Sequence, residues 1–129
     1  MSDKLSTRIG WTLSGIVILF LVMDLAMKFA VLQPVIDTMA ALGWPTDTPT
    51  IHILAILLAI GTGLYAWPRT GLLGAILLTG YLGGAIATHA RLGNPLLTHT
   101  LFGAYLGIAA WAGLWLRDPA VRALLPFRK

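Results

Sequence analysis

The sequence has no cysteine among its 129 residues, and only 11% of them are charged. The absence of cysteine excludes disulfides, thiolate metal sites, iron–sulfur clusters and cysteine nucleophiles. An average soluble domain has about 25% charged residues. Nine basic and five acidic side chains are too few to cover a water-soluble globule of this size. Disorder is excluded as well, because disordered chains are rich in charge and poor in apolar residues.

Apolar residues dominate the chain, at 57% with a mean hydropathy of +0.82. The length fits one domain, residues 1–129. A membrane-spanning helix needs about 20 mostly apolar residues, and four segments approach that length: 9–32, 51–67, 72–90 and 96–116. Proline and glycine at their junctions are ordinary helix stops. The sequence therefore predicts an all-α integral membrane bundle of four transmembrane helices, with the lipid bilayer as its solvent.

The longest connection, residues 33–50, contains three prolines and two aspartates but no lysine or arginine. Its apolar residues make a free linker a poor interpretation. We expect residues 35–42 to form a short helix on the membrane surface, closed by Gly43.

The distribution of basic residues predicts the orientation, because Lys and Arg collect on the cytoplasmic side. With four spans, the termini and the second connection share one side. That side holds seven basic residues, whereas the opposite connections hold Arg91, with Lys28 near that edge. We expect both termini in the cytoplasm of a multi-pass protein of the bacterial inner membrane. The net charge of +4 is too scattered for a nucleic-acid surface.

Small residues recur four apart in three helices: Ala59 and Gly63, Gly80 and Gly84, and Gly103 and Gly107. Lipid gives no hydrophobic drive for helix association, so such residues commonly allow helices to pack closely. We interpret the stripe of Gly80, Gly83, Gly84 and Ala87 as packing within the bundle. A homo-oligomer seam is the alternative.

Polar residues inside the spans gather on one side of the membrane. Asp24 lies deep in the first span with Lys28 four residues later, and an intramembrane carboxylate is costly unless paired or protonated. The histidines His52, His89 and His99 all lie at the outer helix ends. This one-sided cluster is the strongest functional signal in the chain, although each residue also has a structural interpretation as an ion pair or an interfacial side chain. No metal site is predicted, because the candidate ligands come from four separate helices.

One block of the third span, GLLGAILLTGYLGGAIATHAR over residues 71–91, resembles the DoxX-like family of small four-helix membrane proteins. The pair Asp24 and Lys28, residues 42–45 (LGWP), and residues 115–118 (WLRD) with Pro126 are similar too. The resemblance implies a link to quinone and thiosulfate redox chemistry and to membrane-associated oxidative-stress complexes. Without cysteine, sulfur chemistry would need a partner or a bound cofactor.

Three hypotheses follow for the function. The first is a redox-accessory protein that binds a quinone-like or other lipid-soluble small molecule near the outer leaflet, with electrons from a membrane-associated oxidoreductase partner. The second is a structural subunit of a membrane complex, and the third is a small membrane isomerase or cyclase. Asp24, Lys28 and His89 are the predicted catalytic residues, since they can donate or relay protons. The predicted ligand-binding residues are Tyr81, Thr88, Arg91, His52 and His99.

Overall fold

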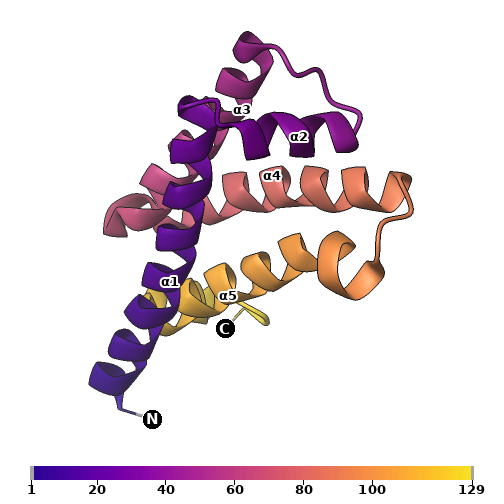
Figure 1. Ribbon diagram of the computed structural model, residues 1–129. Coiled ribbons are helices and arrows are strands. Elements are labelled where there is room, and N and C mark those ends of the chain that lie inside the picture. Colours follow the sequence, from indigo (N-terminus) through magenta and orange to yellow (C-terminus); the bar gives the residue numbers. More distant parts are fainter. Residues whose placement is uncertain (1, 129) are drawn as a thin grey trace.

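The computed structural model describes residues 2–128, which form helices with no strand. In chain order these are α1 (Asp3–Phe29), α2 (Gln33–Ala41), α3 (Thr48–Ala66), the 3-10 turn η1 (Pro68–Thr70), α4 (Gly71–Arg91), the π-helical turn η2 (Leu96–Thr100), α5 (Phe102–Arg117) and α6 (Pro119–Leu124) (Figure 1).

Within residues 2–128, four helical segments are long and apolar enough to cross a membrane: Asp3–Phe29, Thr48–Ala66, Pro68–Arg91 and Leu96–Arg117. The predicted four-helix membrane fold is therefore confirmed. The first helix begins earlier than residue 9 because the hydroxyl of Ser2 accepts a hydrogen bond from the backbone N–H of Leu5, which caps the first turn. The fourth span opens with a π-helical turn before regular α-helix begins.

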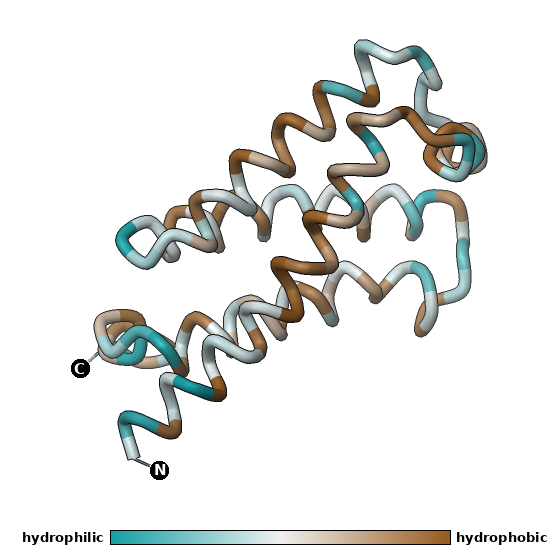
Figure 2. The backbone as a smooth tube through the Cα atoms, turned by 60° about the vertical axis from the view of Figure 1, so that its left-hand side comes forward, coloured by the Kyte–Doolittle hydropathy of each residue, from teal (hydrophilic) through white to brown (hydrophobic). Residues whose placement is uncertain are grey.

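The four spans form a closed arrangement in which α1 and α4 each pack against both α3 and α5. Figure 2 shows both termini at one end of the bundle, here named the termini end, and α2 at the opposite end, here named the α2 end. The cytoplasmic location of the termini remains a prediction.

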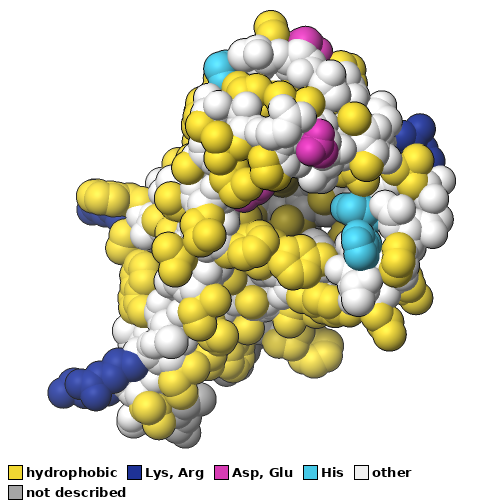
Figure 3. All heavy atoms as spheres, viewed as in Figure 1, with side chains coloured by type: hydrophobic (Ala, Val, Ile, Leu, Met, Phe, Trp, Pro, Cys, Tyr) yellow, Lys and Arg dark blue, Asp and Glu magenta, His cyan; other side chains and the backbone are white. Residues whose placement is uncertain are grey.

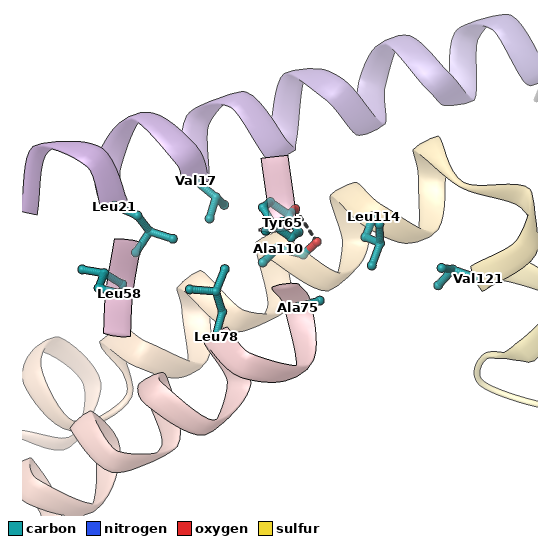
Figure 4. Packing of buried hydrophobic residues seen from close by; sticks show 9 residues of the cluster. All are labelled: Val17, Leu21, Leu58, Tyr65, Ala75, Leu78, Ala110, Leu114 and Val121. Atoms are coloured by element: carbon teal, nitrogen blue, oxygen red, sulfur yellow. Dashed lines mark hydrogen bonds between the residues drawn. The ribbon is translucent and has the colours of Figure 1, made fainter. Parts of the chain in front are cut away.

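The larger of the two hydrophobic core clusters runs from the middle of the bundle toward the termini end (Figure 4). Tyr65 is fully buried there, and its hydroxyl donates to the carbonyl of Ala110 at 2.6 Å. Arg117 is 8% exposed and donates to the carbonyl of Tyr65, with its guanidinium 4.1 Å from the centre of a Trp11 ring. These contacts tie α1, α3 and α5 together at the termini end.

The closest approaches between helices are at glycines outside the expected pairs. A methyl group on Gly74 of α4 would lie 2.1 Å from the backbone nitrogen of Tyr65, and one on Gly10 would lie 2.6 Å from that of Arg117. By contrast, a methyl group on Gly80, Gly83 or Gly84 would meet no atom within 4 Å. The interpretation of that stripe as bundle packing is therefore wrong.

Helix α2 lies across the end of the bundle opposite the termini, above α4 in the view of Figure 1. It confirms the short helix expected over residues 35–42. Val35 and Met39, one turn apart, are buried against Ile51 of α3, which anchors α2 to the transmembrane bundle. Gly43 then adopts a positive φ of 77°, which ends the segment as expected.

Asp47 fixes the start of α3. Its carboxylate accepts hydrogen bonds from the backbone N–H and the hydroxyl of Thr50. These hydrogen bonds, with that from the hydroxyl first, hold the pKa of Asp47 below its usual value because they favour the ionised form. The connection from α2 therefore ends at a defined helix cap.

Val31 joins α1 to α2 in a conformation that disfavours its side chain. Its φ is +51°, and the N–H groups of Val31 and Leu32 donate to the carbonyls of Lys28 and Met27. This is a Schellman cap, in which glycine is usual. A β-branched residue in the left-handed region costs about 1–2 kcal/mol. Val31 packs against the buried cluster of Val35, Met39 and Ile51, and this contact offsets the cost.

We expect Val31→Gly to stay within about 1 kcal/mol of the native stability, because relief of backbone strain compensates for the lost contacts. Val31→Ala should be less stable than Val31→Gly, because alanine keeps the strain and loses two methyl groups. Thermal unfolding in detergent, followed by circular dichroism, compares the two variants. A glycine variant less stable than the alanine variant would contradict the argument.

Candidate ligand cavity

A partly open cavity of about 560 Å³ lies at the α2 end, lined by α1, α2, α4 and the segment from η2 into α5, with Leu54 from α3. Figure 3 shows the hollow beneath the surface formed by α2, with histidine side chains at one edge and hydrophobic side chains on its walls. Ligand sites commonly have volumes of about 300–1,000 Å³ with apolar walls and a few convergent polar groups. The polar side chains lining this cavity belong to Asp24, Lys28, Thr38, Tyr81, Thr88, His89 and His99.

Asp24 and Lys28 contribute a charge pair from α1. The ammonium of Lys28 donates to the Asp24 carboxylate at 2.6 Å, and the Lys28 side chain is only 13% exposed. Lysine therefore folds back toward the carboxylate instead of extending to the membrane surface. The pairing offsets the cost of holding the two charges at a partly buried site within a membrane span, where an isolated charge would be costly.

Tyr81 and Thr88 line the cavity from α4, and their hydroxyls differ in availability. Thr88 donates to the carbonyl of Gly84 at 2.8 Å, one helical turn back. The hydroxyls of Tyr65 and Tyr105 also donate to carbonyls, whereas that of Tyr81 has no protein acceptor within residues 2–128. Tyr81 therefore presents an unused donor to the cavity.

Two histidines form the edge of the cavity where α4 ends and η2 begins. The rings of His89 and His99 have centroids 6.0 Å apart in an edge-on arrangement. The side-chain amide of Asn94 lies 2.8 Å from Nδ1 of His89. With the amide nitrogen as donor, Nδ1 accepts, and the proton of neutral His89 is on Nε2. Asn94, in the turn between the two histidines, therefore sets the tautomer of His89.

The cavity owes much of its space to glycine. Gly80 and Gly84 lie on its wall, and a methyl group on either would enter open space. These glycines and His89 lie on different faces of α4, yet all line the same cavity because it extends around the helix. Gly83 faces an apolar groove on the other side of α4.

Arg91 and His52 lie outside the cavity. Arg91 reaches α2, where its guanidinium donates to the carbonyl of Leu42 at 3.4 Å. His52 donates from Nε2 to the carbonyl of Phe29 at 3.1 Å and packs beside the Phe29 ring. Both side chains thus contact the ends of other helices at the α2 end, and the other six predicted site residues line the cavity together.

The sequence interpretation missed several cavity residues. Phe20, one turn before Asp24 on the same face of α1, was open to prediction from helix periodicity. Met39 and Trp44 come from the connection, whose fold back over the bundle has no sequence signature. Asn94 could not be predicted as a site residue, because its hydrogen bond to His89 depends on the turn that brings it back to that ring.

Within the described residues, no three histidine, aspartate or glutamate side chains lie close enough to hold a metal ion. The polar groups of the cavity are therefore arranged as hydrogen-bond donors and acceptors around an apolar space.

Comparison with known proteins identifies a family but no close relative. No curated protein and no solved structure matches the chain. The model of the DoxX-like family matches residues 12–113, a range that runs from α1 through most of α5 and includes every polar residue of the cavity. With a match over most of its length, this chain belongs to the DoxX-like family, as a membrane protein with four helices able to span the bilayer.

Proposed function

We propose that the cavity binds a small lipid-soluble molecule with a polar head, of the quinone class, and that the protein serves as a redox-accessory subunit. The observation that carries the proposal is the convergence of six independently predicted polar residues on one cavity of about 560 Å³ with mainly apolar walls. A structural bundle gains nothing from an open space beside a partly buried charge pair, since close packing is more stable.

The available groups suit a carbonyl-bearing ring. Quinone oxygens accept hydrogen bonds, and the Tyr81 hydroxyl, the Lys28 ammonium and Nε2 of His89 are donors around the cavity. Asp24, bonded to Lys28, is a carboxylate that can accept and release a proton. Quinone reduction takes two electrons with two protons, and the electrons would come from a membrane-associated oxidoreductase.

Trp44 provides a direct measurement, because its indole lines the cavity and a bound quinone quenches nearby tryptophan fluorescence. The probe is a benzoquinone with a decyl chain, titrated against the purified protein in detergent. We expect saturable quenching that is largely lost in Trp44→Phe. The other tryptophans report non-specific partition of the probe.

Filling the cavity tests whether this space is the site. Gly80→Leu should weaken binding by at least about tenfold, equal to 1.4 kcal/mol, because its side chain enters the open space beside Tyr81. Gly63→Leu is the matched control, since Gly63 also has no neighbour within 4 Å but lies outside the cavity. Equal affinity in both variants would contradict the proposal. Absence of saturable binding, together with firm co-purification of another polypeptide, would favour the structural-subunit hypothesis.

A further inference from the structure

The cavity has two borders of opposite character. The border toward the α2 end carries the histidine pair, whereas the border between α1 and α5 is lined by two phenylalanines. Phe20 of α1 and Phe102 of α5 both line the cavity, with ring centroids 5.3 Å apart and ring planes at 56°. Each residue is 42% exposed in total, a value that includes area facing the cavity. The pair therefore lies on the cavity lining and is only partly covered by other side chains.

The phenylalanine pair lies where α1 and α5 are not in close backbone contact. Near the termini end the two helices meet backbone to backbone at Gly10 and Gly113. Closer to the α2 end, two large side chains occupy the space between the helices instead. Partly exposed rings can change rotamer in nanoseconds without moving a helix. This border can therefore open by side-chain rotation alone.

The surface around Phe20 is apolar. Ile16, Leu19 and Met23 of α1 are each more than half exposed, as expected for residues that face lipid hydrocarbon. A molecule crossing this border moves from hydrocarbon into the cavity without meeting water. A polar solute has no favourable route there.

The polar side chains of the cavity lie toward the α2 end, and the phenylalanine pair lies farther from it. Phe20 lies one helical turn, about 6 Å, from Asp24 toward the termini end, and Lys28 lies one turn farther toward α2 on the same face. The polar groups that would hold a head group are thus at the α2 side, and the apolar border is deeper in the membrane. A ligand with its head beside Asp24 has its far end directed to the phenylalanines.

We infer that the ligand is an amphiphile with a long apolar chain, that it enters sideways from the bilayer between Phe20 and Phe102, and that its chain stays in the lipid while the head is bound. The inference rests on the proposed function and specifies the class of ligand for the same site. Leaving the chain in hydrocarbon avoids exposing its CH₂ groups to water at any step, which would be unfavourable for each of them.

A crosslink across the border provides the test. Because the native chain has no cysteine, the double variant F20C/F102C carries thiols only at this border. The protein is reconstituted in vesicles and joined with a short bifunctional thiol reagent. We expect the rate of Trp44 quenching by the decyl benzoquinone to fall at least about tenfold, and a monofunctional reagent on the same variant to leave the rate within about twofold.

A second variant covers failure of the crosslinked protein to fold. F20A/F102A widens the border without linking the helices, and we expect both association and dissociation of the decyl probe to accelerate several-fold. Unchanged rates in the crosslinked and widened proteins, with binding retained, would overturn sideways access but leave the proposed function intact. Absence of saturable binding in the native protein would instead overturn the proposed function.

Discussion

Gly74→Ala is expected to lower the free energy of unfolding by about 3 kcal/mol or more, the upper range for overpacking a core. An added methyl group would lie 2.1 Å from the nitrogen and 2.4 Å from the Cα of Tyr65. Both are backbone atoms of α3, so no side-chain rotation can relieve the overlap. Helices α3 and α4 must separate, which disturbs the hydrogen bonds of the buried Tyr65 to α1 and α5.

Gly80→Ala is the matched comparison on the same helix. Its methyl group meets no atom within 4 Å, and alanine is favoured over glycine in a helix by up to about 1 kcal/mol. Thermal unfolding of both variants in the same detergent should place Gly80→Ala at or above the native midpoint and Gly74→Ala far below it. The reverse order would show that the helix packing described above is wrong.

These two glycines show how far the sequence could predict the packing. A spacing of four places two small residues on one helix face, but it does not reveal whether that face meets a helix, a cavity or lipid. Gly103 was correctly expected to pack, since its methyl group would lie 3.1 Å from Ile86. Gly74, in the same block of sequence as Gly80, makes the closest approach to the backbone of another helix, but it was not among the glycines expected to pack.

The number and approximate extent of the spans were predictable, because hydropathy and proline positions directly reflect the lipid environment. The polar cluster was also predictable as a set, because membrane depth alone brings helix ends to one level. Membrane depth does not, however, show whether a side chain faces the cavity or another part of the bundle. His52 and His99 both lie near helix ends at the same side, yet only His99 lines the cavity.

His89→Gln is expected to leave the helices folded and to weaken binding of the decyl benzoquinone by about tenfold. Glutamine fills similar volume and can still bond to Asn94, so the turn after α4 keeps a partner for its amide. It cannot present an imidazole N–H at the position of Nε2, and it carries no proton that exchanges near neutral pH. The site would lose a donor, and any proton transfer through this residue would stop.

The control for His89→Gln is the same exchange at His52, which also lies near a helix end but bonds to the Phe29 carbonyl outside the cavity. Quenching titrations of both variants, with circular dichroism to verify folding, separate a site role from a general effect of losing an interfacial histidine. We expect the affinity of His52→Gln to stay within about twofold of native. Equal losses at the two positions would remove His89 from the site and favour the hypothesis that the polar cluster only stabilises the bundle.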